Sequence, residues 1–471
     1  MKRSLVLVLL ALGLPAAAAA QGGQTMLTVY NQDLALVRQV RTIPVQQGIF
    51  PFRFEDVTAK IDPTSVSLEA LSGPPLAILE QNYAYDLVND QKVLEKSIGQ
   101  PITFFETIGN EEKSFTGTLL SVSGNRAVIK TGEGIYVGAP SRFLLEKLPP
   151  GLILKPTLVW LLKGEQAGDQ RVALSYLTSG LSWQANYVLL LSKDERHAGF
   201  TGWVTLTNQS GIGFEDATLK LMAGDVHRVE KAQPPRPMLM RAEAAPSPQQ
   251  FEEKGLFEYH LYTLQRPATV ANNETKQIQL ISAPEVPVTK SYVYDGANLS
   301  GYRGWYYGSR ENRDLGVPSN KKVAVYLGFD NKAASGLGIP LPKGTVRVFQ
   351  NDSDGSAQFI GEDSIDHTPK DEHLRIQLGE AFDIVGERKQ TEFRVVVPNH
   401  VVEESFAITL RNHKKEAVTV RVAEVLYRWS NWEITKESMP HEKVDSQTVV
   451  FPVNVPSDGQ ADVTYTVRYT W

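Results

Sequence analysis

Apolar and polar residues alternate with a period of two along most of this chain, and this pattern restricts it to a β-rich fold. In the last segment, the apolar or aromatic residues Val463, Tyr465, Val467, Tyr469 and Trp471 alternate with Thr and Arg. Successive side chains of a strand point to opposite faces of a sheet, so one face of such a segment is buried. Turn residues separate many short runs of this kind, which predicts an all-β, multi-domain chain with immunoglobulin-like β-sandwich units.

The first residues have the pattern of a secretory signal peptide. Lys2 and Arg3 precede an apolar run from Leu5 to Leu14, and three alanines end at Ala20. We expect residues 1–20 to be removed after Ala20, which implies a periplasmic or secreted protein. The apolar run is too short for a spanning helix, and the sequence predicts no transmembrane helix elsewhere.

The composition excludes several classes of function. The chain of 471 residues contains no cysteine, so it has no disulfide framework and no cysteine nucleophile. Its formal net charge is −5, which argues against nucleic acid as a partner. The oligomeric state does not follow from the sequence.

The N-terminal part predicts two domains. Residues 25–87 alternate in short runs and indicate a β-domain. Residues 88–150 contain a helical pattern, "VNDQKVLEKSIG", and five short strand candidates, which is typical of a small closed barrel of the Src-homology-3 (SH3) or Sm type, with Gly117 at a bend. We expect this module to be a structural spacer, because export and the acidic balance disfavour RNA.

The remaining sequence predicts two sandwiches, over residues 151–320 and 321–471. In the first, Trp183, Ala185 and Tyr187 share one strand face. A proline-rich flexible linker at residues 230–250 and an aromatic loop at residues 291–314 interrupt it. Within "NQSGIGFEDATLKLMAGD", residues 210–213 form a loop, and a strand with Ala217, Leu219 and Leu221 on one face follows.

Several segments resemble a known family in their order along the chain. These are "NQDLALVRQVR", "FEDVTAKIDPTSVSL", "ILEQNYAYDL", "LSWQANY", "NQSGIGFEDATLKLMAGD", "GEDSIDHTPKDE" and "LGEAFDIV". Together they resemble bacterial proteins with domain of unknown function 4139, to which the mucoidy inhibitor A family is more distantly related. The resemblance implies an exported, β-rich envelope protein and supplies no catalytic residues.

The aromatic loop is the main candidate for a binding surface. Tyr292, Tyr294, Tyr302, Trp305, Tyr306 and Tyr307 are interspersed with glycines. Tyr and Trp give a large contact area with few torsions to fix, and glycines let a loop adapt. We therefore expect Tyr302, Trp305, Tyr306 and Tyr307 to contact an envelope protein or a glycan. The alternative is a lid of rings folded over the sandwich.

An acidic segment with a histidine is a candidate for a divalent metal site. Glu362, Asp363, Asp366 and His367 carry the ligand types that such metals use. The alternative is a solvated loop, because Asp366 and His367 would diverge on a strand. The segment "NDSDG" lacks acidic residues at the first and last positions of a calcium loop and predicts a hairpin turn instead. No other cofactor is expected.

Motifs of the common hydrolases are absent from the sequence. It contains no G-x-S-x-G, no H-E-x-x-H and no phosphate-binding glycine loop with its lysine. We therefore predict a non-catalytic binding or structural module of the envelope. Two alternatives stay open: a metal-dependent envelope hydrolase using the acidic segment, and an outer-membrane β-barrel suggested by the aromatic terminal strand. An inward-facing closing strand of a sandwich explains the same alternation.

Overall fold

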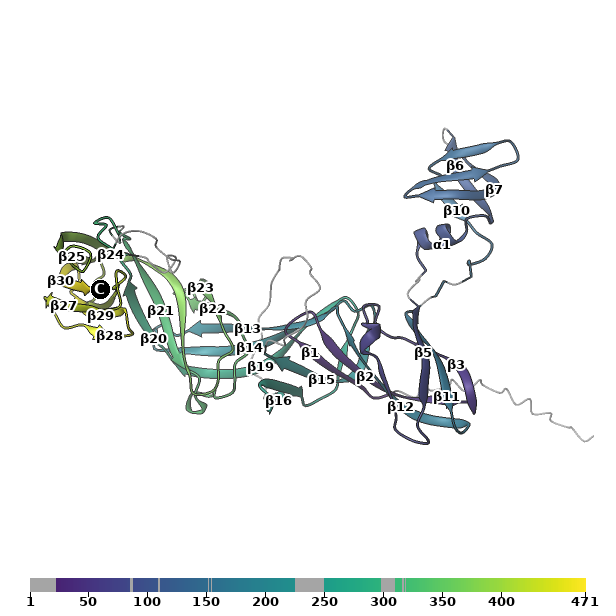
Figure 1. The fold of residues 1–471 in the computed structure, drawn as a ribbon, viewed down its shortest axis with the longest axis horizontal. Helices are drawn as coiled ribbons and strands as arrows, with labels where there is room; N and C mark the ends of the chain where they lie inside the picture. Colours follow the sequence, from purple (N-terminus) through teal and green to yellow (C-terminus); the bar gives the residue numbers. More distant parts are fainter. Residues whose placement is uncertain are drawn as a thin grey trace, which may run out of the picture. The chain divides into compact units, whose positions relative to one another are not determined.

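The computed structural model (Figure 1) describes residues 23–84, 88–108, 111–150, 152–153, 155–224, 250–297, 310–315, 317 and 319–471. Within these residues the chain forms strands β1 to β30, the helix α1 and two short 3-10 turns, η1 (Pro63–Ser65) and η3 (Ala333–Ser335). The predicted all-β, multi-domain class is confirmed. The expected signal peptide, residues 1–20, and residues 230–249 of the expected linker lie outside the described residues.

The chain divides into two compact units. The first contains residues Met1–Ser182, Thr207–Lys220 and Arg266–Glu274, and the second contains Trp183–Leu206, Leu221–Gln265 and Thr275–Trp471. Both units are therefore assembled from segments that are distant in the sequence.

The first unit contains an antiparallel sheet in which β2 lies between β1 and β12. Its strands are β1 (Thr25–Tyr30), β2 (Ala35–Val45), β12 (Gly168–Thr178) and β4 (Ser67–Ala70). On the side of β1 the sheet continues with β15 (Phe214–Ala223), which also pairs with β18 (Ala268–Val270). Leu27, Val29 and Val37 are fully buried, in phase with the alternation in the sequence.

A separate sheet of the first unit has β11 in its centre. Strand β11 (Thr157–Gly164) pairs with β3 (Gly48–Glu55) on one side and with β5 (Ala77–Ala84) on the other. The indole of Trp160 lies against the rings of Phe52 and Phe54. Trp160 also donates from Nε1 to the side chain of Gln81, at 3.2 Å, so its polar atom is satisfied.

A small module is inserted between the paired strands β5 and β11. It consists of α1 (Asp90–Lys96), capped by Asn89, and of β6 (Pro101–Ile108), β7 (Glu111–Ser123), β8 (Arg126–Lys130), β9 (Ile135–Gly138) and β10 (Arg142–Leu144). The strand order β10, β6, β7, β8, β9 forms an open sheet, not the closed barrel expected from the sequence. Gly117 lies where β8 approaches β7 closely. A Cβ at this position would be 2.7 Å from the carbonyl oxygen of Lys130, which is closer than a side chain allows.

The second unit contains a five-stranded sheet. In order, its strands are β19 (Glu274–Pro287), β14 (His197–Asn208), β13 (Leu181–Leu191), β22 (Gly344–Asn351) and β23 (Ala357–Ile365). Strand β22 runs parallel to β13, with Ala185 opposite Gly344. Trp183, Ala185 and Tyr187 are buried, as the alternation predicts. A hairpin of β16 (Phe251–Leu256) and β17 (Tyr259–Leu264) belongs to the same unit.

A nine-stranded sheet forms the C-terminal part of the second unit. In order, its strands are β27 (Trp432–Glu437), β30 (Gly459–Thr470), β25 (Val401–Asn412), β24 (His373–Val397), β21 (Lys322–Asp330), β20 (Thr289–Tyr294), β26 (Val418–Val425), β29 (Thr448–Val455) and β28 (Glu442–Lys443). The long strand β24 pairs with β21 through its first half and with β25 through its second half. Strand β24 therefore joins two sets of strands, and the nine-stranded sheet packs around a hydrophobic core of its own.

The boundary expected between residues 320 and 321 does not separate these two sheets. Strand β20 precedes that position and belongs to the nine-stranded sheet, whereas β22 and β23 follow it and belong to the five-stranded sheet. The sequence does not indicate which of the two sheets a strand joins, because the strands of both sheets have the same alternating pattern.

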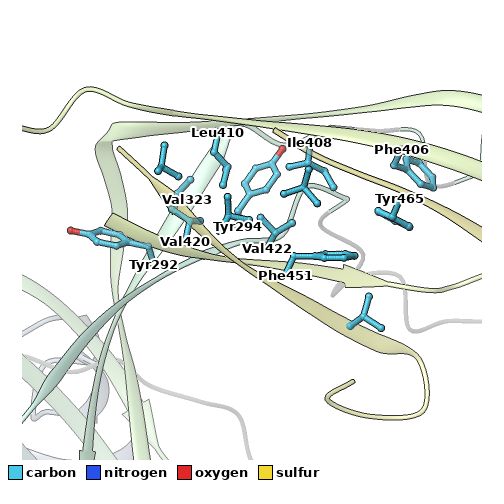
Figure 2. Close-up of a cluster of buried hydrophobic side chains, with 14 of the residues drawn as sticks. Tyr292, Tyr294, Val323, Phe406, Ile408, Leu410, Val420, Val422, Phe451 and Tyr465 are labelled. Atoms are coloured by element: carbon cyan, nitrogen blue, oxygen red, sulfur yellow. The ribbon is translucent and has the colours of Figure 1, made fainter. Parts of the chain in front are cut away.

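Figure 2 shows the core of the nine-stranded sheet. Tyr292 and Tyr294 are buried in it, because they lie on strand β20 and not in a loop, which corrects the predicted start of the aromatic loop at residue 291. Val463, Tyr465, Val467 and Tyr469 are also buried there. The alternation of the terminal segment therefore faces inward, as in the closing strand of a sandwich.

Three buried asparagines at the ends of strands hold the following loops through side-chain hydrogen bonds. Nδ2 of Asn412 donates to the carbonyl oxygens of Glu416, Val455 and Pro456 at 2.8, 3.4 and 3.0 Å. Nδ2 of Asn208, the last residue of β14, donates to the carbonyl oxygens of Ile212, Val270 and Ala271 at 2.9, 3.4 and 3.0 Å. Asn331 makes similar bonds to Ile339 and Pro369 at 2.7 and 2.9 Å. The loop at residues 210–213, which the sequence predicts, is held by the hydrogen bond from Asn208 to Ile212.

No helix among the described residues has the length and apolar character that crossing a membrane requires.

Candidate binding pocket

The four residues of the predicted metal site make other contacts. Glu362, on β23, pairs with Arg347 at 3.0 Å. The carboxylate of Asp363 accepts from the backbone N–H groups of Ser364 and Gln377. The carbonyl oxygen of Asp366 accepts from the Thr368 hydroxyl, and His367 Nδ1 accepts from the N–H of Lys343.

These contacts do not gather the four side chains into one ligand set. Among the described residues, no group of three or more His, Asp or Glu side chains could hold a metal ion. The metal site stays a prediction from the sequence.

The four predicted binding residues Tyr302, Trp305, Tyr306 and Tyr307 lie outside the described residues. The segment that follows them in the chain, residues 310–315, is described and borders a pocket in the second unit. The end of the predicted aromatic loop, residues 310–314, is thus connected to a defined cavity.

The pocket has a volume of about 600 Å³ and is formed by loops at strand ends. Its lining comes from residues 310–315, the β24–β25 turn, the segment after β26, the residue before β29 and the residue after β30. It comprises Arg310, Glu311, Leu315, Asn399, Tyr427, Arg428, Trp429, Ser430, Gln447 and Trp471. The lining combines three aromatic rings with six polar or charged side chains, so it is more polar than the mostly apolar lining of common ligand pockets.

Arg310 stacks on two indole rings at this pocket. Its guanidinium carbon lies 3.7 Å from the centre of the Trp429 ring and 5.6 Å from that of Trp471. Arginine favours such faces because its planar cation is attracted to the ring quadrupole and is weakly hydrated. The stacking fixes the cation at the edge of the pocket.

A buried ion pair positions the Arg310 segment. Arg428 Nη2 lies 2.8 Å from Glu404 Oε2, and both side chains are fully buried. Nη1 of Arg428 donates to the carbonyl oxygens of Arg310 and Asn312 at 2.9 and 2.8 Å. The Tyr427 hydroxyl donates to the carbonyl oxygen of Leu315 at 2.8 Å. The rim of the pocket is therefore attached to the charged groups beneath it.

The charge states of this cluster follow from its surroundings. Burial, the largest influence, lowers the pKa of Arg428, but the hydrogen bond to Glu404 and the charge of that carboxylate outweigh it, so the pKa is raised. Burial raises the pKa of Tyr427, and the Glu404 charge raises it further. The pKa of Tyr469 is raised for the same two reasons. At neutral pH the arginine is therefore charged and both phenols are neutral.

Three atoms of this cluster lack a hydrogen-bond partner among the described residues. They are Glu404 Oε1, Arg428 Nε and Tyr469 Oη, all of them buried. Buried polar atoms usually have a partner, often an ordered water, and an unpaired one is costly. Of the three residues, Arg428 lines the pocket and Glu404 and Tyr469 do not, so internal water is the partner expected for these buried atoms.

The same domain contains another buried ion pair that serves the core. Arg388 on β24 donates from Nε to both oxygens of Glu424 on β26, at 3.0 and 2.9 Å. The hydroxyl of Tyr465 on β30 donates to Glu424 at 2.5 Å, and the guanidinium of Arg388 lies 3.8 Å from the ring centre of Phe406. This cluster connects four strands but does not line the pocket.

The sequence interpretation missed both ion pairs although the pattern contained a signal. Glu404 occurs two residues after Val402 and two before Phe406, on the buried face of its strand. Glu424 and Arg428 continue the buried series of Val418, Val420 and Val422 in the same way. A charged residue in phase with an apolar face indicates a buried, paired charge.

Comparison with protein families gives a match for the C-terminal two thirds of the chain. A family model described as Domain of unknown function (DUF4139) matches residues 172–471. The match begins within β12 and includes every residue that lines the pocket. A search of curated proteins gives no match.

Proposed function

Because the chain belongs to the family of Domain of unknown function (DUF4139), and because the matched region contains the whole pocket, we propose that it is a non-catalytic binding protein of the bacterial cell envelope. In this proposal the Arg310 pocket holds a glycan. The predicted aromatic residues Tyr302, Trp305, Tyr306 and Tyr307 precede the pocket segment in the chain.

The observation that carries the proposal is the combination of side chains at the pocket. Trp429 and Trp471 line the pocket as half-buried aromatic surface, which a sugar ring can contact beside the stacked Arg310. Arg310, Asn399 and Gln447 supply donors and acceptors that match hydroxyl groups. A pocket of about 600 Å³ is of the size that takes small ligands or a short stretch of a polymer.

The pocket lining suits binding better than acid–base catalysis. It contains Ser430 but no histidine, and its carboxylate, Glu311, accepts from the backbone N–H of Asn399. A nucleophile needs an adjacent base within hydrogen-bond distance, and this lining offers no such pair. The location in the envelope is supported by the signal-peptide pattern of residues 1–20.

The test is binding of the purified mature chain to a bacterial cell-wall polysaccharide, measured by co-sedimentation with purified peptidoglycan. We expect Trp429→Ala and Trp471→Ala each to weaken binding by roughly tenfold or more, the typical loss for a buried aromatic contact. Arg375→Ala is the matched control, because Arg375 stacks on Tyr326 at 4.2 Å outside the pocket lining. Equal binding by all variants, with thermal unfolding unchanged, would refute the pocket as the site.

A further inference from the structure

We propose that this pocket selects glycans that carry a carboxylate and that the guanidinium of Arg310 binds that carboxylate. The inference rests on the proposed glycan-binding function and adds the chemical class of the ligand. It depends on Arg310 being half-buried at the pocket. Arg196, Arg313 and Arg375 also have no ion pair to a described carboxylate, but they are exposed and do not line the pocket.

The other arginines near carboxylates are already paired. Ion pairs join Arg347 to Glu362, Arg388 to Glu424, Arg394 and Arg468 to Glu403, Arg411 to Glu387, Arg421 to Glu442 and Arg428 to Glu404. Among the described residues, no carboxylate lies within ion-pair distance of the Arg310 guanidinium, whose contacts there are the two indole rings. Arg310 is thus a half-buried cation without a counter-ion in the described part of the chain.

Stacking leaves the hydrogen-bond donors of Arg310 available. The N–H groups of a guanidinium lie in its plane and point away from its faces, so contact with indole faces uses none of them. A carboxylate matches two parallel N–H groups of an arginine, and such charge-assisted pairs are about twice as strong as neutral hydrogen bonds. The same indole that orients Arg310 also excludes water from one side of it.

Glu311 restricts the charge that the pocket can accept. Its carboxylate lines the pocket next to Arg310 in the chain and accepts from the N–H of Asn399. Arg428 adds no net charge, because Glu404 pairs with it. Among the lining side chains, one available cation lies beside one fixed anion. Glu311 would repel a phosphate dianion more strongly than a singly charged carboxylate, so these side chains favour the carboxylate.

The experiment compares three ligands with the same sugar ring. N-acetylglucosamine is neutral, N-acetylmuramic acid adds a carboxylate, and N-acetylglucosamine 6-phosphate adds a phosphate. Binding to the full mature chain is measured by calorimetry at constant ionic strength. We expect the muramic acid to bind roughly tenfold more tightly than the neutral sugar, as one charge-assisted pair implies.

The variants assign the preference to one side chain. Arg310→Gln should remove the preference for the carboxylate and leave weak binding of the neutral sugar. Arg310→Lys should retain part of it, because lysine keeps the charge but loses the planar pair of donors. Arg375→Gln is the matched control and should bind all three ligands as the wild-type chain does.

Each other outcome has a definite meaning. Equal binding of the neutral and carboxylated sugars, abolished by Trp429→Ala, would overturn the carboxylate inference and leave the proposed function standing. Tighter binding of the phosphate would overturn the choice of carboxylate. Failure of the wild-type chain to bind these sugars or peptidoglycan would overturn both proposals.

Discussion

Single buried polar side chains decide several loop conformations of this protein. Asn208, Asn331 and Asn412 are each fully or almost fully buried at the end of a strand. Each uses its amide nitrogen for carbonyl groups and its amide oxygen for a backbone N–H, as Asn412 does for Lys414 at 3.0 Å. A side chain that donates and accepts at once cannot be replaced by one that does only one of these.

Asn412→Asp tests this requirement with almost no change in shape. The carboxylate would face the carbonyl oxygens of Glu416, Val455 and Pro456 without a hydrogen to donate, and it would be buried. We expect a loss of about 3 to 5 kcal/mol in the free energy of unfolding, and about 2 to 4 for Asn412→Ala. Urea denaturation measures both. The exposed Asn454 provides the control, since Asn454→Asp should change stability by less than about 0.5 kcal/mol.

The ion pair of Arg388 and Glu424 makes a different prediction, because both of its charges are buried. Removing one partner by Arg388→Met or Glu424→Leu leaves the other charge unpaired, at a cost of about 3 to 5 kcal/mol. The double variant should lose much less than the sum of the two single losses. A double-mutant cycle by denaturant unfolding measures the coupling.

The exposed pair of Arg421 and Glu442 is the comparison for that cycle. Its side chains are 42% and 53% exposed, so its coupling should stay below about 1 kcal/mol. If the two cycles gave the same coupling, the pair of Arg388 and Glu424 would not act as a buried pair in solution.

At the scale of elements, we predict that the pairing of β5 with β11 does not depend on the module inserted between them. Ala84, the last residue of β5, is opposite Thr157, the first residue of β11, so these ends lie within the distance of a cross-strand pair. Replacing residues 85–156 by a short Asn-Gly turn should therefore leave the β5–β11 pairing intact. We expect the shortened chain to fold, to keep Trp160 buried and to retain glycan binding.

Tryptophan fluorescence and co-sedimentation with peptidoglycan measure these two properties. The fluorescence of Trp160 is read against a Trp160→Phe variant of the same shortened chain. Exposure of Trp160 in the shortened protein would show that β5 and β11 need the module in order to pair.

The elements could be predicted from the sequence more reliably than their partners. The alternation predicts the strands around Trp183, Ala217 and Val463, because each strand's own residues show which of its faces is buried. It could not give the parallel pairing of β13 with β22, nor the membership of β20, since pairing depends on residues that are distant in the sequence. For the same reason Tyr292 and Tyr294 were assigned to a loop.

The candidate site was predictable only in part. The four predicted binding residues, Tyr302, Trp305, Tyr306 and Tyr307, lie outside the described residues and stay a prediction, whereas Arg310 and Glu311 of the same predicted loop line the pocket. The other lining residues, such as Asn399, Trp429 and Trp471, come from loops that only the fold brings together. A charged residue such as Glu404 within an apolar series indicates a buried ion pair, and its partner Arg428 lines the pocket.

At the scale of the whole molecule, the proposed export predicts where the mature chain begins. The signal-peptide pattern ends at Ala20, so the mature protein should begin at Gln21. Expression of the full gene in a bacterium, followed by fractionation and mass spectrometry of the intact chain, tests this. Recovery of the uncleaved chain from the cytoplasmic fraction would contradict the envelope assignment, whatever the pocket binds.

Both units also contain buried tyrosines, and these make global stability sensitive to alkaline pH. Burial raises the pKa of Tyr294 to about 12 and holds the pKa values of Tyr187, Tyr465 and Tyr469 well above their ordinary value. Burial also raises the pKa of Tyr176 in the first unit. In each case the folded chain disfavours the phenolate, because a buried charge loses its hydration.

The sign of the effect follows from proton linkage. Below about pH 10 these phenols are protonated in both the folded and the unfolded chain, so they leave stability unchanged there. Above that pH the unfolded chain ionises first, and each tyrosine lowers the free energy of unfolding by up to about 1.4 kcal/mol per pH unit until its folded pKa is reached. Several such residues acting together should unfold the protein cooperatively between about pH 10 and 12.

Near-ultraviolet absorbance of the phenolate, recorded together with circular dichroism, measures this transition. We expect the exposed tyrosines to ionise first and the buried ones to ionise in one step that coincides with loss of β-structure. Tyr294→Phe removes one of the titrating groups and also the bond that its hydroxyl donates to the carbonyl oxygen of Asn320 at 2.6 Å. That variant should be less stable at neutral pH but should lose stability less steeply above about pH 10. Smooth ionisation of all tyrosines near pH 10 with unchanged circular dichroism would mean that these side chains are not buried in solution.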